Sequence, residues 1–339
     1  MFHKILVPLD GSSIAASALS HVLAVTQQHE SSITLMRVVE PAPSDASVIN
    51  PTDWQLQRSE ASTYLDEIVA ECADTCKAAV NNVVMEGPAA DRILEHAQAH
   101  GHDLIVISSH GKGGISHWNV SSVALKVIHR CGVSILLVRA YQVSEWEASG
   151  TIHPVRYHKI CVPLDGSLRS EHVLPAATRL AEKHDAELLL VHGVVKPELF
   201  DRTPIDSEYS ALIENIVEHN RRQAERYFDE LSQRLDVSLK TYVIASEDVT
   251  SSLHRFVDEH GVDLVILSAH GRSGRQGWRY GSLTSGFIAY GTTHLLIMQD
   301  VPWQEIDEGS AAHAAKADQT AAMQRRETCA APTQQADSW

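Results

Sequence analysis

The sequence predicts an α/β protein made of two tandem, doubly wound domains, each with a five-stranded and mostly parallel sheet. The first observation behind this prediction is a duplication. Residues 4–12 (KILVPLDGS) recur as residues 159–167 (KICVPLDGS), and residues 101–111 recur in similar form as residues 261–271. The second observation is that short apolar runs, rich in β-branched residues, alternate with longer segments of helical length in both copies.

The spacing of the copies indicates their boundaries. Residue 4 matches residue 159 and residue 101 matches residue 261, so the offset grows from 155 to 160 and indicates a small insertion around residues 197–207. A period of this length means tandem domains, because solenoid repeats are about 20 to 50 residues long. We expect a first domain over 1–140, a linker over 141–157, a second domain over 158–300, and a disordered tail over 301–339.

The same order of elements is expected in both copies. In the first copy we expect strands over 4–10, 32–39, 82–86, 103–108 and 134–139, and helices over about 13–29, 53–79, 89–100 and 121–131. In the second copy we expect strands over 159–165, 187–195, 239–245, 263–268 and 294–299, and helices over about 168–184, 208–235, 249–260 and 282–290. The strand segments are short and apolar, as buried parallel strands are.

Several boundaries have local causes. Ser12 and Ser13 follow a strand-ending Asp-Gly and are typical caps of a first helix. Gly101 and Gly261 stand where a helix is expected to end in the left-handed conformation. Pro175 falls inside a predicted helix and predicts a kink or a late start there.

Composition excludes several classes of function. The formal net charge of -15 argues against a nucleic-acid partner, because binding a polyanion needs a basic surface. The five cysteines are odd in number and scattered, so we expect reduced thiols rather than a disulfide framework. The N-terminus enters a strand without an apolar signal core, and no apolar run approaches the roughly 20 residues of a membrane span. These features predict a cytoplasmic protein with no membrane partner.

A glycine-rich loop follows the fourth predicted strand of the second copy. Gly271, Gly274 and Gly281 let the backbone approach a ligand with its amides pointing inward. Ser282 adds a hydroxyl where a helix begins, at the partly positive end of the helix dipole. Arg272 adds positive charge to the loop. The pattern predicts a phosphate site.

These residues resemble the universal stress protein family in its tandem two-domain form, over nearly the whole chain to about residue 300. The resemblance implies an adenine-nucleotide alpha-hydrolase-like fold. It also implies a G-x2-G-x9-G-[S/T] loop in the members that bind ATP, with an aspartate at the end of the first strand. The second copy reads S-x2-G-x9-G-S with Asp165, and the first reads S-x2-G-x9-S-S with Asp10. Both copies depart at the first glycine, and the first copy also departs at the third, where Ser121 puts a Cβ close to phosphate at a residue that glycine would let adopt a positive φ.

The resemblance implies binding of ATP or another adenine nucleotide, with Mg²⁺ as a candidate counter-ion, mainly in the second domain. We expect the aspartate to accept hydrogen bonds from the ribose or the adenine. The candidate nucleotide-binding residues of the second copy are Pro163, Asp165, Ser268, Gly271, Arg272, Gly274, Gly281 and Ser282. The weaker candidate set of the first copy is Pro8, Asp10, Ser108, Gly111, Gly114, Ser121 and Ser122.

Other interpretations of the same residues stay open. Asp-Gly-Ser is also a turn with a helix cap and needs no ligand. Cys72 and Cys76 lie four apart on a predicted helix, which suits two metal ligands, but a buried core stripe is the commoner explanation. His110 and His270 are expected to hold the loops by hydrogen bonds rather than to catalyse. No metal site and no catalytic constellation is predicted, so we expect at most slow ATP hydrolysis.

The sequence leaves three hypotheses about function. The first hypothesis is a stress-response protein that binds an adenine nucleotide and acts as a sensor or regulator. The alternative is a nucleotide-free interaction module that forms a homodimer or binds a protein partner through the sheet edges at 134–139 and 294–299, a pairing that a tandem chain can also satisfy internally. An enzyme acting on a nucleotide-like substrate is suggested by fold analogy alone.

Overall fold

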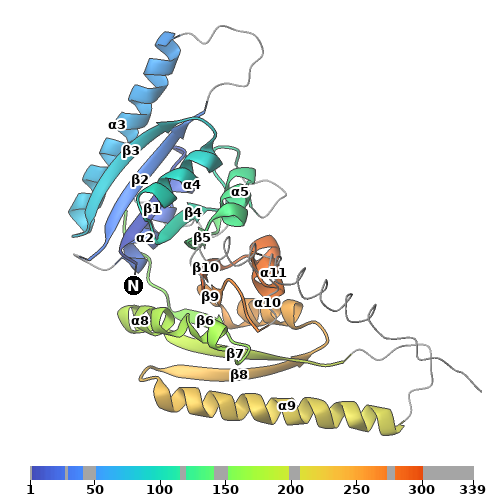
Figure 1. Cartoon of the computed structure of the whole chain (residues 1–339). Coiled ribbons are helices and arrows are strands. Elements are labelled where there is room, and N and C mark those ends of the chain that lie inside the picture. The colour runs from blue at the N-terminus through green and yellow to red at the C-terminus, as the bar shows by residue number, and fades with distance from the viewer. Residues whose placement is uncertain are drawn as a thin grey trace, which may run out of the picture.

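The computed structural model describes residues 2–26, 30–40, 51–114, 120–140, 152–197, 207–272 and 279–300. Within this part of the chain, ten strands form one continuous sheet in the order β3-β2-β1-β4-β5-β10-β9-β6-β7-β8 (Figure 1). Residues 198–206 of the insertion predicted around 197–207, the linker residues 141–151 and the predicted tail at 301–339 lie outside the described residues.

Each copy contributes five strands with helices between them, as predicted. The first copy consists of β1 (Lys4–Pro8), α1 (Ser13–Ala16), α2 (Ala18–Val25), β2 (Ser32–Val39), α3 (Pro51–Thr75), β3 (Ala79–Glu86), α4 (Ala89–Ala99), β4 (Leu104–Ser108), α5 (Ser122–Arg130) and β5 (Ser134–Val138). The second copy consists of β6 (Lys159–Pro163), α7 (Leu168–Glu171), α8 (Leu174–His184), β7 (Glu187–Val195), α9 (Ser207–Arg234), β8 (Leu239–Ser246), α10 (Val249–His260), β9 (Leu264–Ser268), α11 (Ser282–Tyr290) and β10 (His294–Met298).

The predicted helix boundaries are largely confirmed. The Ser12 side chain accepts a hydrogen bond from Ala15 N and caps α1. Gly101 and Gly261 follow α4 and α10 with φ of +63° and +60°, the left-handed conformation expected of them. Pro175 lies in the first turn of α8, so the late start is the correct alternative.

Three predicted helices differ from the structure. The single helix expected over 13–29 is broken into α1 and α2 at Ser17. The helix expected over 168–184 is likewise divided, into α7 and α8. The helix expected to reach residue 79 ends at Thr75, because β3 starts earlier than predicted. All eight residues of β3 pair in register with β2, from Ala79 opposite Ser32 to the far end of both strands. Backbone pairing along a whole neighbouring strand outweighs the local helical pattern.

The two copies join through their last strands. β5 and β10 are antiparallel, with Leu136 opposite Leu296 at the centre of the pairing, whereas the other pairings in the sheet are parallel. Figure 1 shows this junction at the middle of the molecule, between the two copies. The tandem chain thus satisfies internally the edge pairing that the sequence suggested, and β3 and β8 form the outer edges of the sheet.

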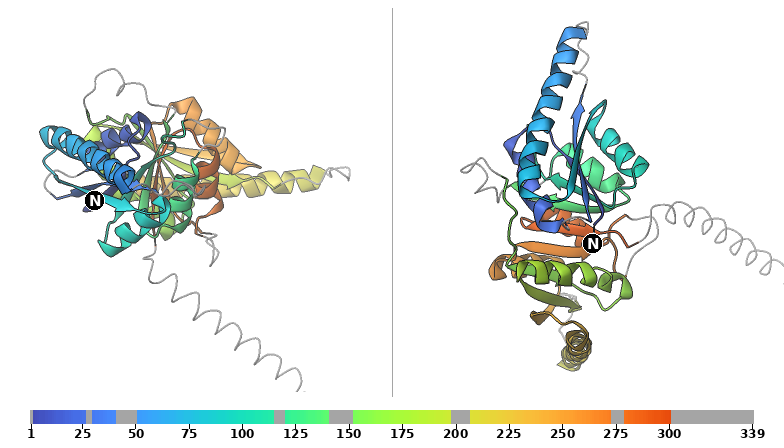
Figure 2. Two further views of the ribbon diagram at one scale, coloured as in Figure 1. Left: turned by 90° about the horizontal axis from the view of Figure 1, so that it is seen from above. Right: turned by 90° about the vertical axis from the view of Figure 1, so that its left-hand side faces the viewer.

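Helices cover both faces of the sheet, and each face forms one apolar core that runs across both copies (Figure 2). One core contains side chains of α2, α3, α8 and α9, including Leu19, Leu65 and Leu180. The other contains side chains of α4, α5, α10 and α11, including Ile93, Ile128 and Phe287. Because both cores continue through the junction, the copies are packed as one body.

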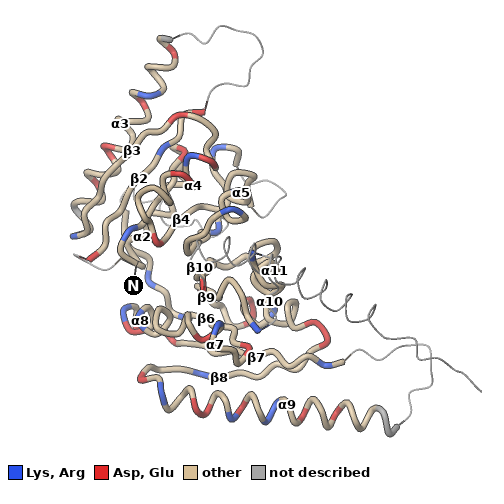
Figure 3. Tube along the Cα trace, in the orientation of Figure 1, with Lys and Arg blue, Asp and Glu red and all other residues tan. Residues whose placement is uncertain are grey.

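Charge is distributed unevenly over these helices (Figure 3). The long helix α9 alternates acidic and basic residues along its exposed side, with ion pairs between Arg222 and Glu218 and between Arg221 and Glu225. Such pairs one turn apart favour an exposed helix. In the described part of the chain, no helix has both the length and the apolarity that crossing a membrane requires.

Candidate functional site

The two glycine loops begin where the first and fourth strands of each copy end side by side. β6 pairs with β9 in parallel, with Ile160 opposite Leu264, and β1 pairs with β4 in the same way. Asp165 follows β6, and the loop that starts at Ser268 follows β9. Ligands of open α/β sheets bind at this carboxyl edge, where neighbouring strands send their connections to opposite faces.

The carboxylate of Asp165 joins the turn after β6 to the glycine loop. Its Oδ1 accepts hydrogen bonds from Ser167 N at 2.9 Å and Ser167 Oγ at 2.5 Å, and its Oδ2 accepts one from Arg272 N at 2.5 Å. Burial alone would raise the pKa of Asp165, but these hydrogen bonds outweigh burial and lower it. The side chain is therefore a carboxylate held in place at neutral pH.

The first copy repeats this arrangement. Asp10 Oδ1 accepts from Ser12 N at 3.0 Å and from Ser12 Oγ at 2.6 Å, and Asp10 Oδ2 accepts from Lys112 N at 2.6 Å. The interpretation of Asp-Gly-Ser as a turn with a helix cap is confirmed in both copies. It is incomplete, because each aspartate also fixes the start of a glycine loop.

The bond between aspartate and loop explains one glycine of the pattern. A Cβ at Gly271 would lie 2.3 Å from Asp165 Oδ2, and a Cβ at Gly111 would lie 2.0 Å from Asp10 Oδ2. Both distances are far below a contact distance, so a side chain at either glycine would displace the carboxylate. Glycine here lets the loop backbone approach the aspartate.

The two loops differ at the residue before their helix. Ser121 is the N-cap of α5, and its side chain accepts a hydrogen bond from Ala124 N at 3.3 Å. Gly281 is the N-cap of α11 and has no side chain to offer to the equivalent amide of Thr284. First-turn amides have no partner inside a helix, so α11 leaves this donor available to an anion, whereas α5 caps its own.

The backbone at this position corrects one sequence-based expectation. Gly281 has φ of -65° and Ser121 has the same value, so neither needs the positive φ considered from the sequence. The nearest atom to a Cβ at Gly281 is Ala269 O, at 3.8 Å. The backbone of Ser121 is therefore not strained. Its effect on a phosphate site comes from its hydroxyl, which accepts a hydrogen bond from Ala124 N and so keeps that amide from a phosphate.

The opening serines of the two loops also differ. Ser108 Oγ accepts a hydrogen bond from His110 N at 3.4 Å. Ser268 is 7% exposed, and its hydroxyl has no hydrogen-bond partner within the described part of the chain. A buried hydroxyl without a partner is costly, so Ser268 Oγ is a group that a ligand or a water would satisfy.

Each loop histidine is held by a hydrogen bond, as expected, but from a different residue. His110 Nδ1 lies 3.0 Å from Ser109 Oγ, which also accepts from Ala140 N at 3.0 Å. His270 Nδ1 lies 2.8 Å from Asp300 Oδ1. Asp300 was not predicted as a site residue, because it stands at the very end of the duplicated region and its counterpart is an alanine.

Asp300 also brings α7 to the second loop. Its side chain is only 3% exposed, and its Oδ2 lies 3.6 Å from Arg169 Nε in an ion pair. Burial would raise the pKa of Asp300, but the His270 hydrogen bond and charge, followed by Arg169, lower it. The carboxylate joins the end of β10, the loop and α7 into one unit.

The second strand of each copy adds a side chain beside the aspartate. In the first copy, Arg37 packs over the turn, with its guanidinium 5.2 Å from the Tyr64 ring centroid and its Nη1 2.6 Å from where a Cβ of Gly11 would lie. In the second copy the equivalent residue on β7 is His192, whose pKa is lowered mainly by burial. The turn glycine of each copy therefore has an arginine beside it: Arg37 from β2 at Gly11, and Arg272 from the glycine loop at Gly166, where its Nη2 would lie 3.4 Å from a Cβ.

The other predicted site residues lie at the same edge of the sheet. Pro163 and Pro8 end β6 and β1, and Ser282 and Ser122 are exposed first residues of α11 and α5. Gly114 has φ of +70° and its N donates to Gly111 O at 2.8 Å in a tight turn. Gly274 lies outside the described residues.

The cysteine pair packs in the apolar core, as the commoner interpretation of its spacing predicts. Cys72 is 1% exposed and packs in the core of α2, α3, α8 and α9, and the half-buried Cys76 packs against that core. Burial raises the pKa of Cys72 to about 12. Over the described ranges, no three His, Cys, Asp or Glu side chains are grouped so as to hold a metal ion.

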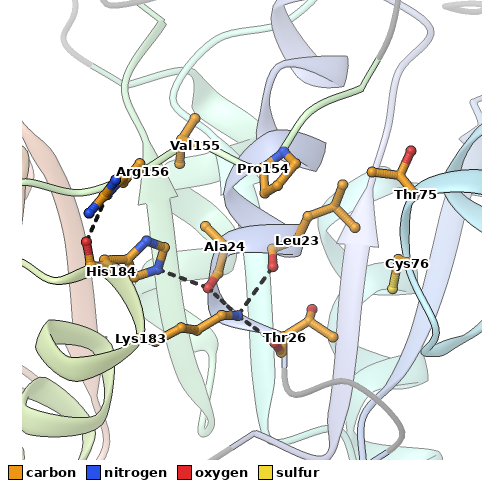
Figure 4. Close-up of a pocket in the computed structure, with 10 residues that line it drawn as sticks. All are labelled: Leu23, Ala24, Thr26, Thr75, Cys76, Pro154, Val155, Arg156, Lys183 and His184. Atoms are coloured by element: carbon orange, nitrogen blue, oxygen red, sulfur yellow. Dashed lines mark hydrogen bonds between the residues drawn. The ribbon is translucent and has the colours of Figure 1, made fainter.

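A pocket of about 390 Å³ lies away from the loops, between the copies on the side of α2 and α8 (Figure 4). Lys183 Nζ donates to Ala24 O and Thr26 O at 2.7 Å each, and His184 Nε2 lies 3.1 Å from Ala24 O. Arg156 Nε donates to His184 O at 2.9 Å. These polar groups hold the end of α2 to the second copy, so we place the candidate site at the loops and not in this pocket.

Comparison with known proteins shows the family and the fold. The model of the universal stress protein family matches residues 1–139 and 156–299. Universal stress protein YxiE of Bacillus subtilis is 29% identical over 154 residues, covering 41% of this chain and all of YxiE. A universal stress protein of Mycolicibacterium smegmatis is 21% identical over 308 residues, covering 88% of this chain and 97% of that protein. The crystal structure of a universal stress protein from Archaeoglobus fulgidus shares the fold, with a TM-score of 0.60 at 14% identity over 88% of this chain and 98% of that one.

Proposed function

This chain belongs to the universal stress protein family, and from that premise we propose that it is a stress-response protein that binds ATP at the second glycine loop and acts as a sensor or regulator. The observation that carries the proposal is the N-terminus of α11. Its N-cap Gly281 provides no side-chain acceptor, so the first-turn amides are available to a phosphate. The equivalent amide of α5 is already bonded to Ser121.

The residues around this helix end fit a nucleotide. The first-turn amides of α11 and the exposed Ser282 hydroxyl would hold phosphate oxygens, and the exposed Arg272 would add positive charge. The buried Ser268 hydroxyl, which has no partner in the described chain, supplies a further donor at the start of the loop. All of these groups lie within one loop and the helix that follows it.

Asp165 fits the nucleoside. Asp165 Oδ1 accepts both hydrogen bonds from Ser167, and Oδ2 accepts the one from Arg272 N. A carboxylate oxygen can accept more than one hydrogen bond, so Oδ2 would accept a ribose hydroxyl or an adenine amino group beside the bond that holds the loop. The lowered pKa keeps this acceptor ionised at neutral pH.

We propose binding rather than efficient turnover. His270 is the loop's histidine, and its Nδ1 is bonded to Asp300 in an arrangement that fixes the loop to β10. Hydrolysis of ATP, if it accompanies binding, is then slow, and Mg²⁺ would enter with the nucleotide.

The alternative of a nucleotide-free interaction module is narrowed by the junction. The strand edges that it required, β5 and β10, pair with each other. An intermolecular version must use β3 or β8, the outer edges of the sheet.

The test is the nucleotide content of protein purified without added ligand, released by denaturation and separated by ion exchange. Gly281→Asp is the test variant, because aspartate is a good N-cap that keeps the helix but places a negative charge where phosphate would bind. Ser121→Asp is the matched control in the first copy. We expect adenine nucleotide from the wild type and from Ser121→Asp, and none from Gly281→Asp.

The proposal fails if the wild type releases no nucleotide and added ATP does not raise its melting temperature, since any ligand of the folded state must do so. It also fails in its assignment to the second copy if Ser121→Asp, and not Gly281→Asp, loses the nucleotide.

A further inference from the structure

The end of the second glycine loop is anchored in the first copy. Tyr280 directly precedes the N-cap of α11, is 5% exposed, and its hydroxyl donates to Ile128 O at 2.8 Å. Arg279 Nη1 donates to Cys131 O at 2.7 Å. Both acceptors lie at the C-terminal end of α5, where backbone carbonyls have no partner inside the helix.

A reciprocal contact runs in the other direction. Arg139, which follows β5 in the first copy and is fully buried, donates from Nη2 to Phe287 O at 2.7 Å and to Ile288 O at 3.1 Å. These carbonyls belong to the C-terminal end of α11. Each of the two helices therefore has a glycine loop at its N-terminus and a side chain of the other copy at its C-terminal end.

The anchor lies next to the proposed phosphate site. The start of the loop is held within the second copy by Asp165, and Gly281 N donates to Ala269 O at 2.8 Å. The side chains of Tyr280 and Arg279 connect this end of the loop to α5, and Tyr280 is the nearer of the two to the N-cap. Moving it would move Gly281 and the first-turn amides of α11, because the residues are consecutive.

The two copies are not equivalent at this position. The counterpart of Tyr280 in the first loop is Val120, which is buried at 3% exposure and has no hydroxyl to donate. Tyr280 of the second loop therefore donates a side-chain hydrogen bond to the other copy, and Val120 of the first loop cannot.

We propose that the second nucleotide site is completed by the first copy, with Tyr280 as a positioning residue that sets the N-terminus of α11 through its bond to α5. This inference rests on the proposed function, since it concerns the same site. Its consequence is linkage between the site and the contact. Nucleotide bound at the second loop stabilises the contact with α5, and loss of that contact weakens the binding of the nucleotide.

The test uses the full chain and a matched pair of tyrosine variants. Tyr280→Phe removes the hydroxyl beside the site. Tyr157→Phe removes an equally buried hydroxyl that also joins the copies, 2.8 Å from His21 Nδ1, but lies far from the loop in the chain and contacts α2 instead. ATP binding is measured by isothermal titration calorimetry in the presence of Mg²⁺, and melting temperatures are recorded for both variants.

We expect Tyr280→Phe to raise the Kd for ATP about fivefold, the effect of one net hydrogen bond. Tyr157→Phe should leave the Kd for ATP within about twofold of the wild-type value. It should lower the melting temperature by about as much as Tyr280→Phe does, because each variant loses one buried hydrogen bond. A wild-type Kd for Tyr280→Phe, or equal weakening in both variants, overturns the positioning role and leaves ATP binding itself established. A wild type that does not bind ATP overturns the proposed function and this inference together.

A second measurement needs no variant. Amide hydrogen exchange of the wild type with and without ATP should show slower exchange at α11 and also at the C-terminal end of α5, around residues 128–131. Protection confined to α11 would overturn the linkage even if ATP binds tightly.

Discussion

Replacing Gly281 by serine transplants the helix cap of the first copy into the second site. The backbone at Gly281, with φ of -65° and ψ of 165°, nearly matches that of Ser121, with -65° and 158°. The nearest atom to a Cβ would be Ala269 O at 3.8 Å, an ordinary contact. The new hydroxyl is therefore expected to accept from Thr284 N, as Ser121 accepts from Ala124 N.

The expected effects on stability and on binding have opposite signs. Serine at an N-cap is better than glycine by a few tenths of a kcal/mol, so the free energy of unfolding should rise slightly. An amide that bonds a phosphate contributes about 1.5 to 3 kcal/mol, because hydrogen bonds to charged groups are the strong ones. Losing it should weaken ATP binding by roughly ten- to a hundredfold.

Isothermal titration calorimetry gives the Kd, and urea denaturation gives the free energy of unfolding. Ser121→Gly is the mirror variant: it should lose a few tenths of a kcal/mol of stability and leave the affinity of the second site unchanged. If Gly281→Ser binds ATP as tightly as the wild type, the open helix amide is not what distinguishes the two loops, and the reasoning from the N-cap is wrong.

Three further perturbations follow from individual contacts. Gly271→Ala should lower the free energy of unfolding by about 1–3 kcal/mol through its clash with Asp165, and the double variant with Asp165→Ala should lose less than the sum of the single losses in urea denaturation. Burial lowers the pKa of His21 to about 4, whereas the unfolded chain takes up this proton near pH 6.5. The contribution of His21 to the free energy of unfolding should therefore be greatest above pH 6.5 and fall by about 3 kcal/mol towards pH 4, and His21→Gln should remove this part of the pH dependence measured by urea denaturation. Lys183→Met should lower the melting temperature, because it removes the bonds that hold the end of α2 to the second copy, while ATP affinity stays unchanged.

The fold was predictable because the local and the global signals agree. Most strands are short apolar runs, glycine or proline marks several of the loops, and the duplication lets one copy support the assignment of the other. Gly101 and Gly261 mark helix ends in both copies, and both adopt the left-handed conformation. The sheet edge where the loops meet followed from strand order alone, since it lies at the carboxyl ends of parallel strands.

Contacts between residues distant in the sequence were not predictable. Nothing in the segment around Tyr280 indicates that its hydroxyl reaches α5, more than 150 residues earlier in the chain. The carboxylate of Asp300 was missed for the same reason, because its partners His270 and Arg169 come together only through the sheet. The conformational strain expected at Ser121 was wrong. A sequence pattern shows that a glycine is absent, but only the backbone angles show whether that position needs a glycine.

The differences between the copies are paired in a way that points to a division of roles. Where the second copy has Ala269 in place of Ser109, it has Asp300 in place of Ala140, so the loop histidine is held in both copies by different means. Because both loops are held, the copies differ instead in two groups that would meet a nucleotide: the N-cap of the helix and the opening hydroxyl. In the first copy both of these groups are bonded within the protein itself, and its helix α5 receives the anchor of the second loop. A copy that fills its own site and supports its neighbour's is expected to contribute to nucleotide binding through the junction rather than through its own loop.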